Sequence, residues 1–585
     1  MGNQIIYSTQ PEDFYYMDIN VPCQGACPAL TNIPSYIRQV FEDRHDRSYE
    51  TNRMANIFPG VLGRVCSRPC ENKCRHGESE LGRPVNICHI KRAAADFRNE
   101  AVAPLEPLFP PCGKSIGIIG SGPSGLAAAH DLATLGFSVT LYEALDKPGG
   151  MLRYGIPKFR LPRYILDAEI DTILGLGIAL KTGVKIGTDL TIREILADHD
   201  AVLAAAGCYR SNRLKVEGEE LPGVFSGLEF MMNVCAGRAP ALGRNVLVIG
   251  AGFTAFDCAR SALRLGAKKA AICLRRTEED LAVTLDEVLE TKIEGIKIHS
   301  LMLSRRILGD GAVEGVEFVR TRPGKPGPDG KKAITPIEGS EFVLAADNII
   351  VATGQAPDPI EGAGERDQRG RLIVDNDAFR TSVNGLYVAG DHLTGPSTVI
   401  KAVSQGRKAA EKIAGDLTGR TFREKVVRLE DVNITDRQRT WDYIPRQDMP
   451  TIEPIEERIT TPDREVETGL TRASALEEAK RCYLCYLHYE IDMSRCIYCR
   501  YCIDVAPRDC IKLVKEIKTN DIGAITGFEE TTSWRDVHAV VIDNSRCIRC
   551  GECMRVCPVE CISVTRVELT ERMSSENEEG GAHGS

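Results

Sequence analysis

The sequence predicts an α/β fold in which two Rossmann-like dinucleotide-binding units lie between a cysteine-rich domain at each end. Two observations carry this prediction. A short apolar strand runs into a glycine-rich turn and then a helix at two places in the middle of the chain. In addition, the chain has 585 residues and 22 cysteines, and none of these cysteines lies in the span 280–481. This length allows several domains, and 43% hydrophobic residues suffice for several cores.

Composition argues against a nucleic-acid-binding protein and against a protein with membrane-spanning helices. The net charge of −9 provides no basic excess to pair with nucleic-acid phosphates. No apolar run has the roughly 18 residues that a membrane-spanning helix needs. The N-terminus lacks a basic region followed by an apolar stretch, so we expect a cytoplasmic protein with reduced cysteines.

The first 112 residues hold most of the irregularly spaced cysteines and are expected to be mostly helical. The spacing is Cys23-x3-Cys27-Pro28 and then Cys66-x3-Cys70-x3-Cys74, followed by Cys88. In a long chain with dinucleotide motifs, such cysteines indicate metal ligands rather than disulfides. Six thiols are two short of the eight that two cubane clusters require. A separate pair, Cys482 and Cys485, would complete the eight.

The first dinucleotide motif is SIGIIGSGPSG at Ser115–Gly125. Gly120, Gly122 and Gly125 permit a tight turn, where backbone N–H groups and a helix N-terminus can meet a pyrophosphate. A second strand at Ser138–Tyr142 ends in Glu143, 18 residues after Gly125. That spacing is typical of the carboxylate that binds a ribose hydroxyl.

The second motif begins at Asn245 as NVLVIGAGFTA, with Gly250, Gly252 and Ala255 in the pattern GxGxxA. The strand that follows ends without an acid and continues into Arg275 and Arg276. A missing acid beside paired arginines suits a 2′-phosphate, which favours NADPH over NADH. The alternative is a pair of solvated arginines without a ligand.

Two later segments are short apolar strands that end in small residues. They are NIIVATG, ending at Gly354, and LYVAGD, ending at Gly390 and Asp391. One dinucleotide site inserted into another is typical of two-dinucleotide flavoenzymes. We therefore expect both segments to return the chain to the first domain, with FAD as the first nucleotide and NAD(P)H as the second.

The C-terminal cysteines follow the spacing of bacterial ferredoxins. Cys496, Cys499 and Cys502 form C-x2-C-x2-C, and Cys547, Cys550, Cys553 and Cys557 form C-x2-C-x2-C-x3-C-P. In such domains the cysteine before the proline ligates the other cluster, so Cys557 should complete the cluster of Cys496, Cys499 and Cys502. The repeated spacing favours two [4Fe–4S] clusters over zinc.

One position departs from this pattern. Ala506 stands where the fourth cysteine of the first run belongs, which leaves Cys547, Cys550 and Cys553 without their expected partner. Cys510 is the obvious substitute. The alternative is that Cys510 is a packed core residue, since Cys561 holds the corresponding place in the second run, and a three-iron cluster would then follow.

The segment Gly149–Pro157, GGMLRYGIP, with Gly150 and Gly155 as candidate cofactor-binding residues, resembles the signature of the glutamate synthase small (beta) subunit family. The same module occurs in dihydropyrimidine dehydrogenase and in the large subunit of NADH-dependent ferredoxin:NADP oxidoreductase. The resemblance spans roughly residues 20–420. It implies a helical N-terminal domain with two [4Fe–4S] clusters, followed by FAD and NADPH.

The resemblance also implies ligand sets. The EAxRCLxC element that accompanies the family's first cluster is found here at 477–485, EEAKRCYLC. The resemblance implies that Cys482 and Cys485 ligate one cluster together with Cys23 and Cys74. Cys27, Cys66 and Cys70 would then ligate the second cluster. We expect Cys88 to be its fourth ligand, a position where the family can also use a non-cysteine side chain.

The remaining cysteines and the domain boundaries complete the prediction. Cys112, Cys208, Cys235, Cys258 and Cys273 lack ligand spacing and are expected to be buried packing residues. The expected segments are a helical iron–sulfur domain (1–112), an FAD-binding domain in two parts (113–235 and 346–420), an inserted NAD(P)H-binding domain (236–345), a connector (421–490), an α+β ferredoxin-like domain (491–567) and a disordered tail (568–585).

The chemistry predicted is electron transfer between NAD(P)H, FAD and four [4Fe–4S] clusters, without a catalytic side chain. We expect the chain to be one subunit of a hetero-oligomeric complex that exchanges electrons with a ferredoxin or a separate catalytic subunit, such as a glutamate synthase-like or 2-oxoacid:ferredoxin oxidoreductase-like one. The alternative is a free-standing or bifurcating NAD(P)H:ferredoxin oxidoreductase.

Overall fold

A computed structural model of the chain describes residues 17, 20–77, 82–99, 104–327, 332–367, 371–375, 379–433, 435, 437–519, 525–544 and 546–573. The chain forms two compact units. Unit 1 comprises 1–101, 420–449 and 469–585, and unit 2 comprises 102–419 and 450–468. The segment expected as a single connector is therefore shared between the two units.

Unit 2 contains a parallel five-stranded sheet in the order β16-β4-β1-β2-β3. Its strands are β1 (Ser115–Ile119), β2 (Ser138–Glu143), β3 (Ala179–Thr182), β4 (Ala201–Ala204) and β16 (Leu386–Val388). Helices α7 (Pro123–Thr134) and α15 (Val399–Thr418) pack against each other beside it. Strand order reverses at β1, and such a reversal places a ligand crevice at the carboxyl ends of the strands.

A second parallel sheet in unit 2 has the order β6-β14-β7-β8-β9. Its strands are β6 (Val224–Ser226), β14 (Asn348–Val351), β7 (Asn245–Ile249), β8 (Lys269–Cys273) and β9 (Lys297–His299). The expectation that Asn348–Gly354 returns the chain to the first domain is wrong for its strand. β14 hydrogen-bonds between β6 and β7, so it completes the second sheet.

The chain re-enters the first domain after β14, where β15 (Gln355–Ala356) pairs with β5 (Arg210–Ser211). An antiparallel layer covers the second sheet with β10 (Met302–Leu308), β11 (Gly315–Pro326), β12 (Lys332–Pro336) and β13 (Phe342–Ala345). The other helices of unit 2 are α8 (Met151–Tyr154), α9 (Arg163–Leu174), α10 (Ile192–Asp198), α11 (Gly227–Cys235), α12 (Phe253–Arg264), α13 (Leu285–Ile293), α14 (Asp391–Thr394) and α16 (Ile455–Thr460).

Unit 1 begins with a helical cluster, as expected from its sequence. Its helices are α2 (Pro22–Ala26), α3 (Ile33–Phe41), α4 (His45–Ala55), α5 (Pro59–Val65) and α6 (Ile87–Asp96), and the distant α17 (Arg472–Lys480) packs on α3 and α6. Asn32 caps α3 by accepting a hydrogen bond from the Ser35 N–H, and Thr471 caps α17 in the same way through Ser474.

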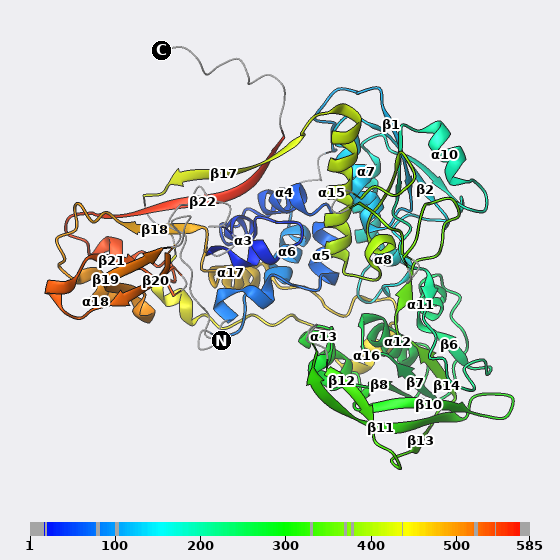
Figure 1. Ribbon diagram of the computed structural model, residues 1–585. Coiled ribbons are helices and arrows are strands. Elements are labelled where there is room, and N and C mark those ends of the chain that lie inside the picture. Colours follow the sequence, from blue (N-terminus) through cyan, green and yellow to red (C-terminus); the bar gives the residue numbers. More distant parts are fainter. Residues whose placement is uncertain are drawn as a thin grey trace. The chain divides into compact units, whose positions relative to one another are not determined.

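The C-terminal part of unit 1 contains two three-stranded sheets. One joins β17 (Arg423–Asp431), β22 (Ile562–Met573) and β18 (Leu487–Ile491), and β17 and β22 run side by side as a long ribbon in Figure 1. The other joins β19 (Ile511–Thr519), β20 (Ile525–Glu530) and β21 (Ala539–Ile542), near the short helices α18 (Tyr501–Val505) and α19 (Glu552–Arg555). β22 extends into the segment expected as a tail, and 574–585 lie outside the described residues.

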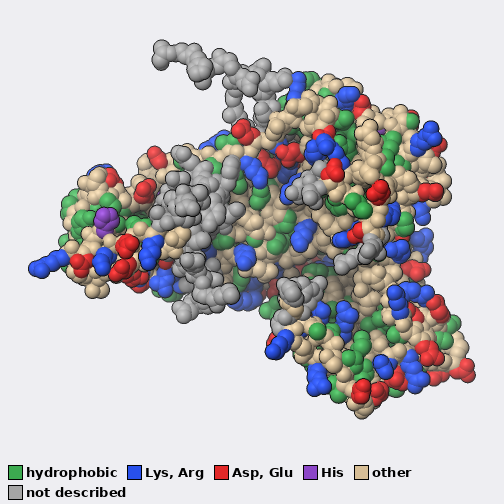
Figure 2. All heavy atoms as spheres, in the orientation of Figure 1, with side chains coloured by type: hydrophobic (Ala, Val, Ile, Leu, Met, Phe, Trp, Pro, Cys, Tyr) green, Lys and Arg blue, Asp and Glu red, His purple; other side chains and the backbone are tan. Residues whose placement is uncertain are grey.

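On the face drawn in Figure 2, acidic and basic side chains are interspersed. No helix in the described part of the chain is both long enough and apolar enough to cross a membrane.

Candidate functional site

The first Rossmann unit surrounds a cavity of about 400 Å³ at the carboxyl ends of its strands. Gly120, Gly122, Glu143, Gly150 and Asp391 line it. Gly125 lies behind the turn, where a Cβ atom would approach the Gly120 carbonyl oxygen to 1.9 Å. Only glycine permits this close crossing of strand and helix, so the turn has the geometry that a dinucleotide pyrophosphate requires.

Glu143 is held in place at the cavity wall. Its carboxylate accepts hydrogen bonds from the backbone N–H groups of Ser121 and Leu145, each at 2.9 Å. The side chain is only 5% exposed but lines the cavity, so its remaining acceptor capacity faces the space where a ribose would bind. The residues present therefore fit FAD.

The other residues predicted for this site lie at or beside the cavity. Asp391 begins α14, accepts a hydrogen bond from the Ser397 hydroxyl at 2.6 Å, and has its carboxyl pKa raised by burial. Gly390 precedes it with φ +68°. Gly155 and Gly354 are each followed by a lining residue, Ile156 and Gln355 respectively.

The second Rossmann unit repeats this turn. The Gly250 N–H donates to the Cys273 carbonyl at 3.3 Å, just as the Gly120 N–H donates to the Tyr142 carbonyl at 2.8 Å. Gly252 is the N-cap of α12 and has open space where a Cβ would be, while Ala255 is buried in that helix. This correspondence places Leu274 where Glu143 stands in the first unit.

That replacement removes the carboxylate that would bind a ribose 2′-hydroxyl. Leu274 is buried, and Arg275 and Arg276 follow it with their backbone carbonyls bound by Thr321 and Leu301. Arg275 is exposed, and the Arg276 Nε has no hydrogen-bond partner among the described residues. The backbone is thus fixed while guanidinium groups remain available, which fits a 2′-phosphate.

In unit 1, Cys23, Cys74, Cys482 and Cys485 line one small, mainly apolar pocket. They come from three segments of the chain, and we call them the split group. Burial and the neighbouring Cys485, Cys482 and Cys74 raise the pKa of the Cys23 thiol. Four thiols facing one apolar space match the requirement of a cubane cluster.

Cys27, Cys66, Cys70 and Cys88 form a second group, which we call the helical group. A hydrogen bond between Cys66 and Cys88 lowers the pKa of Cys66 and raises that of Cys88. Burial raises the pKa of Cys70, with Cys27 and Cys88 contributing in the same direction. The buried Lys91 lies beside all four thiols.

Cys510, Cys547, Cys550 and Cys553 form the inner ferredoxin group. Cys510 hydrogen-bonds to Cys547, and this contact, together with burial, raises the pKa of Cys510. The same hydrogen bond lowers the pKa of Cys547 to about 6. Cys510 therefore lies beside these three thiols, as a fourth ligand would.

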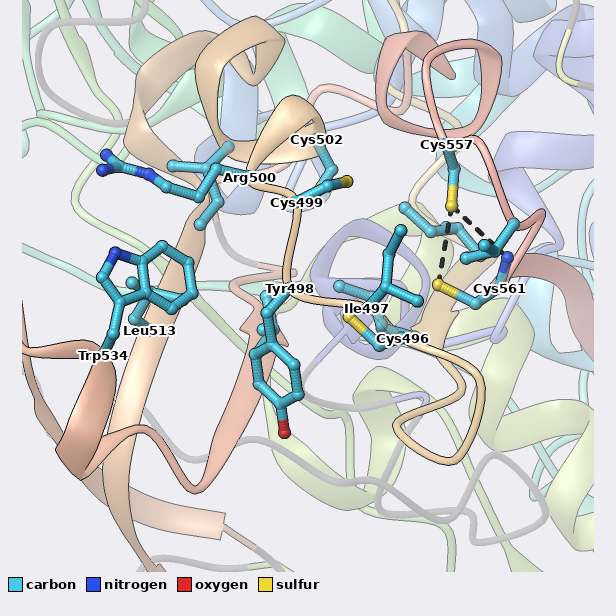
Figure 3. Close-up of a pocket in the computed structure, with 15 residues that line it drawn as sticks. Cys496, Ile497, Tyr498, Cys499, Arg500, Cys502, Leu513, Trp534, Cys557 and Cys561 are labelled. Carbon is cyan, nitrogen blue, oxygen red and sulfur yellow. Dashed lines mark hydrogen bonds between the residues drawn. The ribbon is translucent and has the colours of Figure 1, made fainter.

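Cys496, Cys499, Cys502 and Cys557 form the outer ferredoxin group, and Figure 3 shows them around one pocket. Cys561 also lines this pocket, with its Sγ 3.5 Å from the Cys557 Sγ. Ile497, Tyr498 and Trp534 beside it are exposed, so this group lies at the surface of its domain.

Within the described residues, no three His, Cys, Asp or Glu side chains are arranged to hold a single metal ion. A cubane binds one thiolate at each of four irons, so its ligands lie farther apart than those of one ion. Of the cysteines expected to be buried packing residues, Cys208, Cys258 and Cys273 are buried, whereas Cys235 is half-buried and Cys112 is exposed.

Sequence reasoning missed three residues near the thiols. Cys561 shares the outer pocket, and its equivalence to Cys510 was the available signal. Lys91 follows Cys88 by three positions and therefore shares its helix face. Arg437 contacts two cysteine loops far from it in sequence, and no local pattern indicates this.

Comparison with known families agrees with this organisation. Residues 114–406 match the pyridine nucleotide-disulphide oxidoreductase family. Residues 18–102 match the 4Fe–4S cluster domain described as domain II of dihydropyrimidine dehydrogenase, and residues 495–561 match the 4Fe–4S dicluster domain.

Curated relatives extend the match along most of the chain. The NADP(+)-dependent formate dehydrogenase subunit beta of Moorella thermoacetica is 36% identical and is matched over 80% of this chain and 71% of its own length. The NADPH-Fe(3+) oxidoreductase subunit beta of Geobacter sulfurreducens is 33% identical, over 80% of this chain and 75% of its own length. The glutamate synthase [NADPH] small chain of Escherichia coli is 33% identical, over 67% of this chain and 88% of its own length. The chain therefore belongs to the pyridine nucleotide-disulphide oxidoreductase family, among the glutamate synthase small-subunit-like oxidoreductases with 4Fe–4S domains at both ends.

Proposed function

We propose that the chain is an NADPH-dependent electron-transfer subunit that passes electrons between NADPH and a partner catalytic subunit or ferredoxin, through FAD and four [4Fe–4S] clusters. The observation that carries this proposal is the gathering of all sixteen predicted cysteine ligands into the split, helical, inner and outer groups. The printed names of the relatives, two of them beta subunits and one a small chain, support membership of a hetero-oligomeric complex.

The protein's own contribution is binding and orientation. The Gly120–Gly125 turn and Glu143 would hold FAD, and the Gly250–Ala255 turn with Arg275 and Arg276 would hold NADPH. When bound, FAD accepts two electrons as hydride from NADPH and releases them singly to iron–sulfur clusters. No nucleophilic side chain is needed for this chemistry, and the half-exposed outer group provides the contact with an external acceptor.

Anaerobic purification of the full chain tests this function. We expect about sixteen iron atoms and one FAD per chain, and NADPH should bleach both flavin and cluster absorbance. A catalytic subunit present in stoichiometric amount would identify the acceptor, whereas ferredoxin reduction by the purified chain alone would favour the free-standing alternative. Iron near eight per chain, or clusters that NADPH does not reduce, would refute the proposal.

Substituting Cys510 tests the inner group. In Cys510→Ala we expect the inner cluster to lose about one iron, with a three-iron EPR signal in the oxidised protein, because a cubane corner without a thiolate is labile. Cys273→Ala is the matched control. Cys273 is also buried, but burial alone raises the pKa of its thiol, with no contribution from another cysteine. An unchanged iron content and EPR spectrum in Cys510→Ala would assign Cys510 to packing.

A further inference from the structure

Arg437 connects two loops that carry cluster ligands. Its side chain is fully buried, with 0% exposure. The Nε donates a hydrogen bond to the Cys482 carbonyl at 3.1 Å, and Nη1 donates to the Ile548 carbonyl at 2.8 Å. Ile548 lies between Cys547 and Cys550. One guanidinium group therefore joins a loop of the split group to a loop of the inner ferredoxin group.

Asp442 joins the same two groups a second time. Its carboxylate accepts hydrogen bonds from the Tyr483 hydroxyl at 2.8 Å and from Arg508 Nη2 at 2.6 Å, and Arg437 Nη2 lies 3.7 Å away. Tyr483 lies between Cys482 and Cys485, and Arg508 lies two residues before Cys510. The Arg437 guanidinium also lies over the Tyr483 ring, 4.8 Å from its centroid.

A third contact involves another segment of the split group. Arg75 follows Cys74 directly, and its guanidinium donates a hydrogen bond to the Asn544 carbonyl, three residues before Cys547. The segment at Cys74 is thus linked directly to the segment before Cys547, whereas the loop at Cys482 is linked to the inner group through Arg437 and Asp442. The outer group differs from the inner group in its surroundings, because its pocket opens among exposed side chains.

A buried arginine is costly unless its charge and donors are satisfied. The two carbonyls accept hydrogen bonds from Nε and Nη1, and Asp442 supplies a counter-charge 3.7 Å from Nη2, which has no hydrogen-bond partner among the described residues. Two directed hydrogen bonds and one nearby carboxylate therefore define the orientation of the guanidinium group. A lysine could not reach both carbonyls with one planar group. This arrangement fixes the relative position of two loops, which is what electron transfer between two clusters requires.

We propose that Arg437, paired with Asp442, is a positioning residue that fixes the split group against the inner group, so that electrons can cross there between the N-terminal helical domain and the ferredoxin domain. The inference rests on the ligand sets proposed above. Cys23, Cys74, Cys482 and Cys485 would hold one cluster and Cys510, Cys547, Cys550 and Cys553 the other, and with both bound one electron would pass from the first to the second without any bond forming or breaking. The order of sites is then split, inner and outer group, with the partner at the outer end.

The test uses the full chain with its clusters and compares Arg437→Gln with Arg458→Gln. Arg458 is a matched control because it is also fully buried, but it lies in unit 2 and bonds to Ile452 and Glu453. The first readout is EPR of the dithionite-reduced protein, which detects magnetic interaction between neighbouring reduced clusters. The second is stopped-flow absorbance of flavin and clusters after mixing with NADPH.

In Arg437→Gln we expect unchanged iron and flavin reduction, weaker magnetic interaction, and roughly tenfold or slower reduction of the ferredoxin clusters, since small displacements of paired groups slow transfer strongly. Arg458→Gln should retain the wild-type EPR spectrum and rates. If Arg437→Gln loses iron, Asp442→Asn is measured instead. We expect this variant to keep its full iron content and to show the same weaker magnetic interaction and slower reduction of the ferredoxin clusters.

Wild-type EPR and transfer rates in a fully loaded Arg437→Gln or Asp442→Asn variant would overturn this positioning role. So would a wild-type spectrum without interaction between an N-terminal and a ferredoxin cluster. Failure of the proposed function would be recognised differently, as missing iron or absent reduction by NADPH in the wild-type chain.

Discussion

Replacing both Cys482 and Cys485 with serine should lower the iron content by about four atoms per chain, one whole [4Fe–4S] cluster, while FAD remains bound. The split group supplies the reason, because these two cysteines line one pocket together with Cys23 and Cys74. Two remaining thiolates cannot hold a cubane. FAD binding should persist, since the FAD cavity is formed by residues of unit 2 alone.

Point substitution is a sharper test than deleting the chain from residue 479 onward. Arg481 donates hydrogen bonds to the carbonyls of Arg83 at 2.7 Å and Pro84 at 3.3 Å. β18 and β22, which also lie beyond residue 479, form the sheet with β17. A truncation would therefore remove structural contacts together with the two thiols, and a lost cluster would have two explanations.

Iron analysis and EPR of the reduced protein measure the result. Cys112→Ser is the control, because Cys112 is exposed and outside the four groups. The double variant should also unfold at a lower temperature, since a cluster joining residues 23 and 482 closes a very long loop. If the iron content equals that of Cys112→Ser, the split group is not a cluster site.

The features predicted from the sequence are those with a local signature. The turns at Gly120–Gly125 and Gly250–Ala255 form as expected because a buried strand, a glycine pattern and a helix follow one another within a few residues. The ferredoxin loops are recognisable for the same reason. The split group could also be predicted, although its segments are far apart in the sequence, because the EEAKRCYLC element resembles a family motif.

Features that depend on distant pairing were missed. Nothing in NIIVATG indicates that β14 inserts between β6 and β7. The charged strand β17 was expected as part of a connector, yet it pairs with β22, more than a hundred residues later. Arg437 bonds to carbonyls 45 and 111 residues away. Such contacts are set by tertiary structure, and their hydrogen bonds use backbone groups that every residue possesses.

Replacing Arg275 and Arg276 with alanine should weaken NADPH binding by about 1.5–3 kcal/mol, since a charge-assisted contact to a 2′-phosphate contributes that much. This corresponds to a roughly ten- to hundredfold higher Kd for NADPH. Binding of NADH should change little, because it has no 2′-phosphate. The physical basis is the second Rossmann unit, where Leu274 stands at the position that Glu143 has in the first unit and two arginines follow it.

The measurement is the dissociation constant of each nucleotide, determined by titration of the wild-type and variant chains. Arg305→Ala serves as control, because Arg305 is an exposed arginine of β10 in the same domain and lies outside the proposed phosphate site. A double variant that binds both nucleotides as tightly as the control would mean that the arginines are merely solvated. Equal weakening of NADPH and NADH would instead indicate a general contribution to the fold or to the shared pyrophosphate. Selective loss of NADPH alone assigns the pair to the 2′-phosphate, because that group is the only chemical difference between the two nucleotides.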